Sequence, residues 1–308
     1  MRIVFFGTPP FAAHILKYLF RHDVNIVGIV TRTDKPRGRS LQPQPSAVKA
    51  MACELAPEIP LYQPEKASAD SFLKTLKSLK PDLCLIVAYG EIVKQKLLDL
   101  PKKGCINVHP SLLPKYRGAA PIQRAIINGE AETGVTIMEM IMKLDAGASI
   151  EVMKTKISEE INAGELEERL ADLSCGLLMK VLEQFESGSV KKVPQDENDV
   201  TYAHKIGTDT CRIDWLKRSE EVHNLIRGVA PKPGAWCLVG KKRMKILKAR
   251  VNHQYSGKPG QTADFSEKGW VVNCGDGAID LLEIQMEGKK PTHIEDFVRG
   301  NSSINLLH

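Results

Sequence analysis

Two polar side chains, Asn107 and His109, lie two residues apart at the end of the apolar run 105–109. In an extended strand residues i and i+2 project from one face, so both side chains are expected to face the same ligand. An amide can donate to a developing oxyanion, and an imidazole can donate or take a proton near neutral pH. The pair could equally serve only to satisfy backbone groups at a buried strand end. Taken alone, it leaves catalysis and packing open.

The residues that follow favour catalysis. A rigid turn with apolar side chains suited to a flat ring comes first, and the small residues of 117–121 then allow backbone or ligand to approach closely. This rigid turn consists of Ser111, Leu112, Leu113 and Pro114. Further along the chain, Asp145 precedes Gly147, and an aspartate in that position is either an ordinary turn residue or part of the site.

With these residues the chain resembles the folate-dependent formyltransferases, whose marker is an Asn-x-His strand end running into Ser-Leu-Leu-Pro, with Asp-x-Gly downstream. Further pieces similar to the family follow in the same order over nearly the whole chain. They are FFGTPPFAA, VAYG, VTYAHKI, RIDW and GDGAIDLLEIQ. Their order favours the members that formylate methionine on the initiator tRNA. One departure is Ala148, where the family often has a second aspartate, so any role of that carboxylate is absent.

The resemblance implies N10-formyltetrahydrofolate as the formyl donor, initiator Met-tRNA as the acceptor and tetrahydrofolate as a product. It implies no metal, because the donor is already activated. By the same resemblance Asn107, His109 and Asp145 are the catalytic residues: the first two would donate to the oxyanion, and Asp145 would orient His109 and help remove the amine proton. Ser111 to Pro114 would bind the folate, and Tyr89 and Gly90 would border its pterin.

Two basic stretches are expected to contact tRNA. Residues 34–40 place cations around a glycine and resemble the family's loop that enters the acceptor stem, with Arg37 and Arg39 as the contacts. The second stretch is a hairpin in which alternation spreads cations along an exposed face. Solvated basic surface is the alternative for both stretches. The hairpin residues expected to bind are Lys241, Lys242, Arg243 and Lys245.

An α/β fold is expected to position these residues. Apolar runs at 2–6, 25–31, 83–89 and 105–109 alternate with amphipathic helical patterns, which indicates a Rossmann-like, mostly parallel sheet. Such a sheet binds ligands beyond the carboxyl ends of its strands. Thr8 is expected to cap the first helix, and a capping box formed by Asn162 and Glu165 is expected to start a long helix at 162–186.

The polar residues 189–204 are expected to link two domains. A folate-binding catalytic domain would occupy 1–188, and a smaller, OB-like β-barrel domain that binds tRNA would occupy 205–308. The second domain is predicted from short strands at 235–239, 244–251, 270–274 and 278–285, with glycine turns between them.

Composition narrows the class of protein. In 308 residues, 43% are hydrophobic and 26% charged, which is typical of globular proteins. No apolar run approaches the roughly 20 residues of a membrane helix, so a cytoplasmic protein with no membrane partner is expected. Residues 205–308 hold 17 Lys and Arg against 12 Asp and Glu, so they carry five of the six net positive charges and invite an acidic partner, which we expect to be tRNA and not DNA. Seven cysteines without a CxxC pair predict neither zinc nor disulfides.

Three other functions make different demands on the sequence. A formyltransferase acting on a small amine, such as glycinamide ribonucleotide or a sugar amine, would share the catalytic residues but would not need the basic hairpin or the loop with Arg39. An RNA-binding protein without catalysis predicts loss of Asn107, His109 or Asp145, and all three are present. A nicotinamide oxidoreductase would need GxGxxG and an acidic residue after the second strand, and the sequence has neither.

Overall fold

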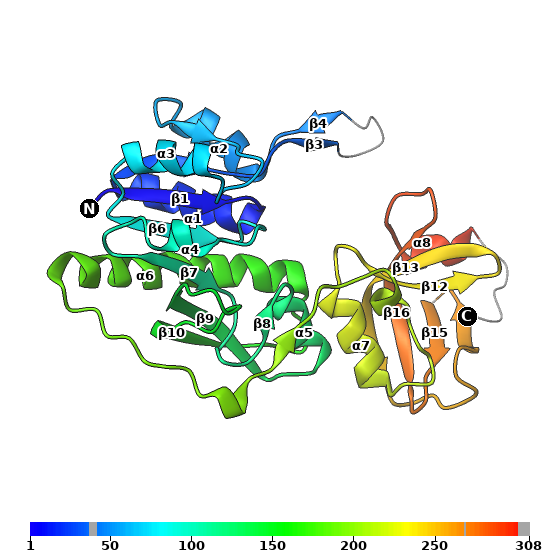
Figure 1. Cartoon of the computed structure of the whole chain (residues 1–308). Coiled ribbons are helices and arrows are strands. Elements are labelled where there is room, and N and C mark those ends of the chain that lie inside the picture. The colour runs from blue at the N-terminus through cyan, green and yellow to red at the C-terminus, as the bar shows by residue number, and fades with distance from the viewer. Residues whose placement is uncertain (37–41, 268, 301–308) are drawn as a thin grey trace. The chain divides into compact units, whose positions relative to one another are not determined.

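The computed structural model describes residues 1–36, 42–267 and 269–300. The chain divides into two compact units, which Figure 1 shows coloured along the sequence. The first unit contains Met1–Gly118, Gly134–Thr155 and Glu167–Tyr202. The second contains Ala119–Thr133, Lys156–Leu166 and the described residues from Ala203 onward. Arg37 and Arg39, predicted to contact tRNA, lie outside the described residues.

A seven-stranded sheet in the order β10-β9-β7-β6-β1-β2-β5 forms the centre of the first unit. The five strands from β7 to β5 are parallel, and β9 pairs antiparallel with β7. The predicted Rossmann-like, mostly parallel sheet is thereby confirmed. The strands are β1 (Ile3–Gly7), β2 (Ile26–Val30), β5 (Leu61–Tyr62), β6 (Leu83–Val87), β7 (Cys105–His109), β9 (Glu132–Glu139) and β10 (Ser149–Lys156), with a small separate hairpin of β3 (Lys35–Pro36) and β4 (Pro43–Gln44).

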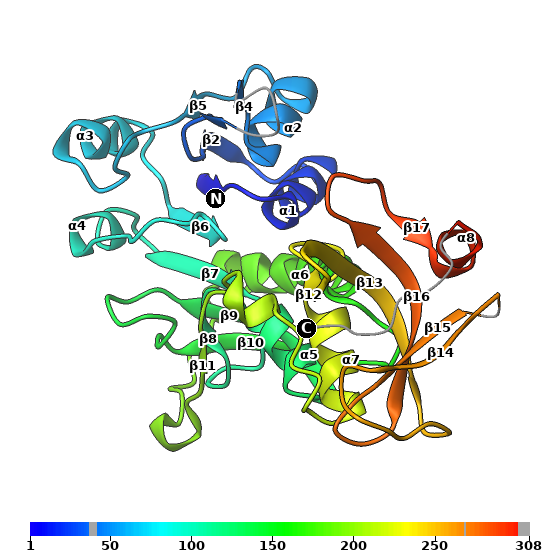
Figure 2. The same ribbon diagram turned by 90° about the vertical axis from the view of Figure 1, so that its right-hand side faces the viewer.

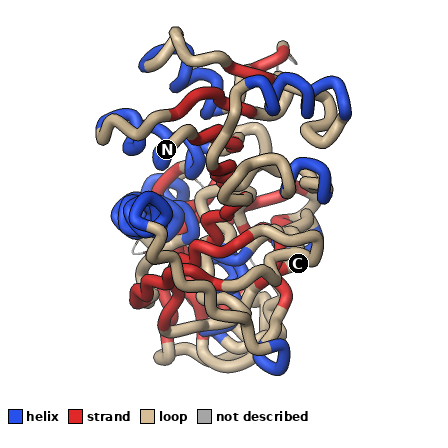
Figure 3. The backbone as a smooth tube through the Cα atoms, turned by 60° about the vertical axis from the view of Figure 1, so that its left-hand side comes forward, coloured by secondary structure: helices blue, strands red, loops and turns tan. Residues whose placement is uncertain are grey.

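Helices cover both faces of this sheet. Figure 2 shows α3 (Asp70–Ser78) and α4 (Gln95–Leu98) on one face, and α1 (Pro10–Arg21), α2 (Ala47–Leu55) and α6 (Ala163–Ser187) on the other. Figure 3 shows helices in blue on both sides of the strands in red. Strand alternation assigns Asn107 and His109 to the same face as Cys105. Cys105 belongs to the apolar cluster on the α3 and α4 side, whose other members include Val4, Phe6, Phe72, Leu76, Cys84, Ile86 and Leu97.

The two helix starts predicted from capping residues have different outcomes. The prediction for Thr8 is wrong: Pro9 is the N-cap of α1, and the Thr8 hydroxyl donates to the carbonyl of Tyr89 at 2.8 Å. The Thr8 hydroxyl is directed to this tertiary acceptor and does not accept from a helix N–H, and the bond ties the ends of β1 and β6 together. The capping box of α6 is confirmed, since the Asn162 and Glu165 side chains accept from each other's backbone N–H at 3.1 and 2.9 Å.

The second unit is built on an antiparallel sheet in the order β12-β13-β16-β15-β14, with β17 paired to β16. Its core includes Trp215, Ile226, Met244, Trp270 and Ile284. The predicted smaller β domain is confirmed. Its elements are α5 (Pro121–Ile127), η2 (Asp209–Cys211), α7 (Ser219–Gly228), β12 (Ala235–Val239), β13 (Lys242–Asn252), β14 (Thr262–Ser266), β15 (Gly269–Asn273), β16 (Ala278–Met286), β17 (Thr292–His293) and α8 (Ile294–Arg299).

Short elements complete the description. They are β8 (Arg117–Gly118), which pairs with β11 (Tyr202–Ala203), and the 3-10 helix η1 (Glu197–Asp199). Within the described residues, no helix is both long and apolar enough to cross a membrane.

Candidate active site

Asn107 and His109 occupy the carboxyl end of β7, between two other strands. Asn107 lies beside Ile86 of β6 and Met138 of β9, and His109 lies beside Thr136 of β9. Asn107 is half-buried, whereas His109 is only 4% exposed. The predicted strand end is therefore present, with an amide and an imidazole on one face of the sheet at the edge where α/β proteins bind ligands.

The imidazole of His109 faces a protein acceptor at each nitrogen. Its Nε2 lies 2.9 Å from the carbonyl oxygen of Tyr116, and its Nδ1 lies 3.7 Å from Oδ2 of Asp145. A carbonyl can only accept, so Nε2 holds a proton and donates it to Tyr116. Nδ1 is then the nitrogen that can exchange a proton with a ligand.

Asp145 is held in place by backbone geometry. Its Oδ2 accepts from the N–H of Gly118 at 2.8 Å, and its own φ of 47° lies in the left-handed region. Gly147, two residues on, packs so closely on β9 that a Cβ atom there would overlap the carbonyl of Glu139. The Asp-x-Gly spacing therefore has a physical reason: the glycine lets the turn rest on β9, and the turn presents the carboxylate to His109.

Replacing Gly147 by alanine is expected to displace this turn and lower kcat/KM roughly a hundredfold, since a shift of about 1 Å in a reacting group has that effect. The matched control is Gly176→Ala in α6, where the added Cβ meets nothing within 4 Å and full activity is expected. Steady-state kinetics, with the melting midpoint of each variant, provide the measurement. Wild-type kinetics in Gly147→Ala would contradict this account of the turn.

The predicted folate-binding turn rests on Thr136 of β9. The Thr136 hydroxyl donates to the carbonyl of Ser111 at 2.7 Å and accepts from the N–H of Leu113 at 3.1 Å. Ser111 is wholly buried and its hydroxyl donates to the carbonyl of Lys115 at 2.7 Å, so Ser111 shapes the turn. Leu112, Leu113 and Pro114 stay half-buried and keep apolar surface for a ligand.

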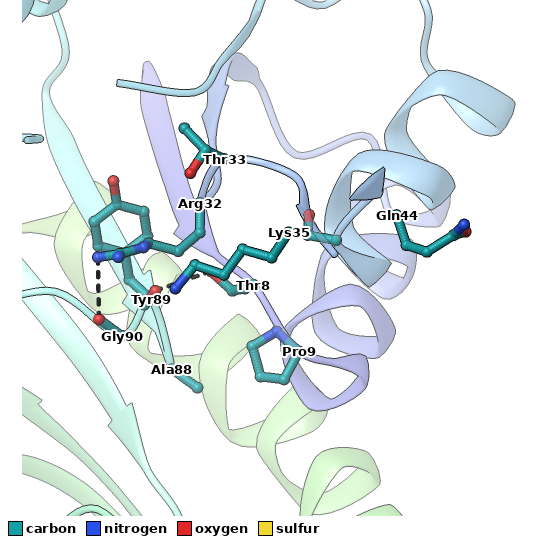
Figure 4. Close-up of a pocket in the computed structure, with 10 residues that line it drawn as sticks. Thr8, Pro9, Arg32, Thr33, Lys35, Gln44, Ala88, Tyr89 and Gly90 are labelled. Atoms are coloured by element: carbon teal, nitrogen blue, oxygen red, sulfur yellow. Dashed lines mark hydrogen bonds between the residues drawn. The ribbon is translucent and has the colours of Figure 1, made fainter. Parts of the chain in front are cut away.

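A separate pocket of about 320 Å³ opens at the carboxyl ends of β1, β2 and β6 (Figure 4). Tyr89 and Gly90 line it, but the three predicted catalytic residues and the turn at 111–114 do not. The side chains of Arg32 and Lys35 extend toward Tyr89, which gives the pocket a cationic wall. Arg32 donates to the carbonyl of Gly90 at 3.3 Å.

Most of the Tyr89 side chain is packed in the core, and little of it is exposed to the pocket. Its ring packs edge-on against Phe6, with centroids 5.5 Å apart, and only 1% of the residue is exposed. Burial, with the nearby Glu91 carboxylate, raises the pKa of the Tyr89 phenol, which therefore stays neutral. No group of three His, Cys, Asp or Glu side chains suited to a metal ion occurs in the described part of the chain.

The basic hairpin formed by β12 and β13 divides into exposed and engaged cations. Lys241, Lys242 and Arg243 are exposed, and the Arg243 guanidinium lies 4.1 Å from the ring centroid of Trp236. Lys245 is half-buried, and its ammonium donates to the carbonyl of Pro233 at 2.7 Å. Three of the four hairpin residues predicted to contact tRNA are thus exposed, with Arg243 stacked on Trp236, while Lys245 also holds the hairpin to Pro233.

Sequence reasoning missed two residues at or beside these sites, Arg32 and Gln195. Arg32 directly follows β2, so the rule that ligands lie beyond the strand ends points to its loop, but Arg32 was not singled out, whereas Lys35 was already part of the basic stretch 34–40. Gln195 lies in the polar stretch 189–204, where nothing local distinguishes it. Its side chain nevertheless contacts the turn of Asp145.

Comparison with known proteins decides the family. The formyl transferase model matches residues 1–182, and the model of the formyl transferase C-terminal domain matches residues 205–302. The chain belongs to the formyl transferase family. Its segments that carry Asn107, His109 and Asp145 all lie within the first match.

Several relatives in this family are similar over nearly their whole length. A methionyl-tRNA formyltransferase of Protochlamydia amoebophila is 46% identical, with 99% of this chain and 97% of the relative covered. One of Chlamydia caviae is 41% identical over the same shares, and one of Pseudomonas entomophila is 43% identical, covering 96% and 94%.

Solved structures share the formyl transferase fold at lower identity. HypX from Aquifex aeolicus in complex with tetrahydrofolic acid has a TM-score of 0.68 and 18% identity over 97% of this chain. This chain spans 47% of the length of HypX. The sugar 3N-formyl transferase WlaRD has a TM-score of 0.66 and 19% identity, covering 94% of this chain and 99% of its own. At these identities the likeness concerns the fold alone.

Proposed function

We propose that this formyl transferase moves the formyl group of N10-formyltetrahydrofolate to the amino group of methionine on initiator Met-tRNA, in the cytoplasm. The observation that carries the proposal is the 40–46% identity, over nearly the whole chain, to relatives named methionyl-tRNA formyltransferase. The pairing of Asn107 and His109 with Asp145 supports formyl chemistry. The excess of Lys and Arg in residues 205–308 supports an RNA acceptor.

The first chemical step is attack of the unprotonated methionine amine on the formyl carbon. The formyl oxygen becomes an oxyanion, and the Asn107 amide donates a hydrogen bond to it, which stabilises the transition state more than the ground state. The half-buried position of Asn107 suits this role, because its backbone is held between β6 and β9 and the residue is partly shielded from water.

Proton transfer then falls to His109. Its Nδ1 takes the proton of the attacking nitrogen, and the Asp145 carboxylate 3.7 Å away stabilises the imidazolium that forms. As the bond between the formyl carbon and N10 breaks, the proton is delivered to N10. The products are formylmethionyl-tRNA and tetrahydrofolate. The half-exposed Leu112, Leu113 and Pro114 would hold the flat ring of the folate.

The acceptor is tested by competition. The protein is incubated with N10-formyltetrahydrofolate and, in separate reactions, initiator Met-tRNA, free methionine, glycinamide ribonucleotide and a nucleotide-linked amino sugar. Formyl transfer to the charged tRNA is expected to exceed transfer to each small amine by orders of magnitude in kcat/KM. A preference for any small amine would overturn the proposed acceptor and favour the alternative of a small-molecule formyltransferase.

Neutralising the exposed cations at Lys241 and Lys242 is expected to weaken tRNA binding in a salt-dependent way. A plot of log affinity against log salt concentration has a negative slope, and each lost phosphate contact makes this slope less steep by about one. The double variant Lys241→Gln/Lys242→Gln is compared with Lys74→Gln/Lys77→Gln, which removes the same charge from exposed positions of α3. Equal salt slopes for the two double variants would show that the hairpin is only solvated surface.

A further inference from the structure

The side-chain amide of Gln195 connects the turn of Asp145 to a buried arginine. Its Nε2 donates to the carbonyls of Asp145 and Gly147, each at 2.8 Å. Its Oε1 accepts from Nε and Nη2 of Arg117 at 3.0 and 2.7 Å. Because a guanidinium only donates and carbonyls only accept, a single amide orientation satisfies all four bonds. Glutamine is the side chain that fits, since it carries both a donor and an acceptor.

Arg117 gives this link its rigidity. The residue is wholly buried, so its charge needs partners, and Glu197 supplies one at 3.0 Å from Nη2. Hydrogen bonds from Lys143 and Arg117 hold the pKa of the Glu197 carboxyl below its usual value, so this partner stays charged near neutral pH. The Arg117 guanidinium is therefore a fixed anchor against which Gln195 can hold the turn.

The backbone around Arg117 touches both proposed proton-transfer residues. The carbonyl of Tyr116 accepts from His109, and the N–H of Gly118 donates to Asp145. The Asp145 carboxylate is thus held from the side of Gly118, while its main chain is held by Gln195. Both contacts lead back to residues 116–118, which link the histidine and the aspartate in one closed network.

The chain around Gln195 is itself fixed to the sheet. Val193 and Ser149 of β10 exchange backbone hydrogen bonds at 2.9 and 2.8 Å, and the backbone N–H of Arg117 donates to the carbonyl of Thr201 at 2.9 Å. Figure 1 shows this segment running from the end of α6 past β10 toward β8. The segment 189–204, which was expected to link the domains, is therefore also held against the first unit by these hydrogen bonds.

We infer that Gln195 is a positioning residue for formyl transfer, one that sets the place of Asp145 relative to His109. The inference rests on the proposed function, because it assigns Gln195 a task only if His109 and Asp145 move the proton. Gln195 contacts no reacting group itself. It acts through the backbone of the turn, so its loss affects the chemical step and leaves substrate binding nearly unchanged.

The test variant is Gln195→Glu. It keeps one acceptor oxygen for Arg117 but replaces the donating amide nitrogen by a second carboxylate oxygen, which faces the carbonyls of Asp145 and Gly147 and pushes the turn away. We expect kcat to fall roughly tenfold to a hundredfold, in line with a displacement of about 1 Å, with KM for both substrates changed less than about threefold. Gln195→Met, which removes the donor without adding charge, is measured in parallel. All rates are taken well below each variant's melting transition.

A matched control makes the same chemical change at an exposed glutamine outside this network. Gln254→Glu is that control, and unchanged kinetics are expected. The deciding readout is a double-mutant cycle with Asp145→Asn. If Gln195 acts through Asp145, Gln195→Glu adds little further loss of kcat in the Asp145→Asn background. Equal losses in both backgrounds, or wild-type kcat in both Gln195 variants, would overturn the inference.

The cycle also separates this inference from the proposed function. An Asp145→Asn variant with wild-type rate, or a wild-type protein that formylates no charged tRNA, would remove the proposed function and the inference together. An active protein that Asp145→Asn disables, combined with additive losses from Gln195→Glu, would overturn the inference alone.

Discussion

Replacing Asn107 by alanine is expected to lower kcat for formyl transfer roughly a hundredfold to a thousandfold, with KM little changed. Loss of one preorganised donor to a developing oxyanion typically has this effect, and a hundredfold corresponds to about 2.7 kcal/mol of barrier. The backbone that carries the amide is held by β6 and β9 on either side of β7, which limits the reorganisation needed when charge develops. Single-turnover rates with saturating substrates isolate the chemical step.

The control for Asn107→Ala is Asn25→Ala, which removes an exposed amide just before the amino end of β2. Wild-type rates are expected there. A retained full rate in Asn107→Ala would refute the oxyanion role and leave the family assignment intact, since that assignment rests on the whole chain.

Removing His109 is expected to cost a factor of about 10² to 10⁴ in kcat, the range typical of a general acid or base. The informative variant is His109→Gln, because its amide can still donate to the carbonyl of Tyr116 and so preserve the bond that His109 Nε2 makes. It lacks a nitrogen that can exchange a proton at the position of Nδ1. A folded, inactive His109→Gln protein is therefore the expected result.

Asp145 provides the internal check on this prediction. On the proposal that Asp145 acts through His109, combining His109→Gln with Asp145→Asn should reduce kcat little more than His109→Gln alone. Multiplicative losses would mean that the carboxylate has its own contact with the substrate. Circular dichroism and the melting midpoint of each variant establish that the comparison is made between folded proteins.

Local pattern was sufficient for the strand that carries the site. The run 105–109 coincides with β7, and period-two alternation alone placed Asn107 and His109 on one face. Asp145 was found only through its motif, because the reasons for its position, the N–H of Gly118 and the close packing of Gly147 on Glu139, depend on contacts between distant segments.

Long-range contacts also explain what the sequence did not reveal. Gln195 lies 78 residues from Arg117, within a polar stretch whose composition is typical of a linker. Thr8 follows the capping rule by type and position, yet its hydroxyl bonds to Tyr89, 81 residues away. In both cases the partner that determines the role of the side chain becomes a neighbour only after folding. The tRNA contacts of the basic loop and hairpin stay predictions.

The bond from His109 Nε2 to Tyr116 has a stereochemical consequence. An imidazole whose Nε2 donates to the backbone has only Nδ1 left to exchange protons with a substrate. In the proposed reaction the entering amine and the departing N10 are therefore both presented to Nδ1, one after the other, while they share the same tetrahedral carbon. With the oxyanion directed to Asn107 and the folate on its own side of the site, only one handedness of the intermediate meets this condition, so the histidine and the asparagine together select which face of the planar formyl group is attacked.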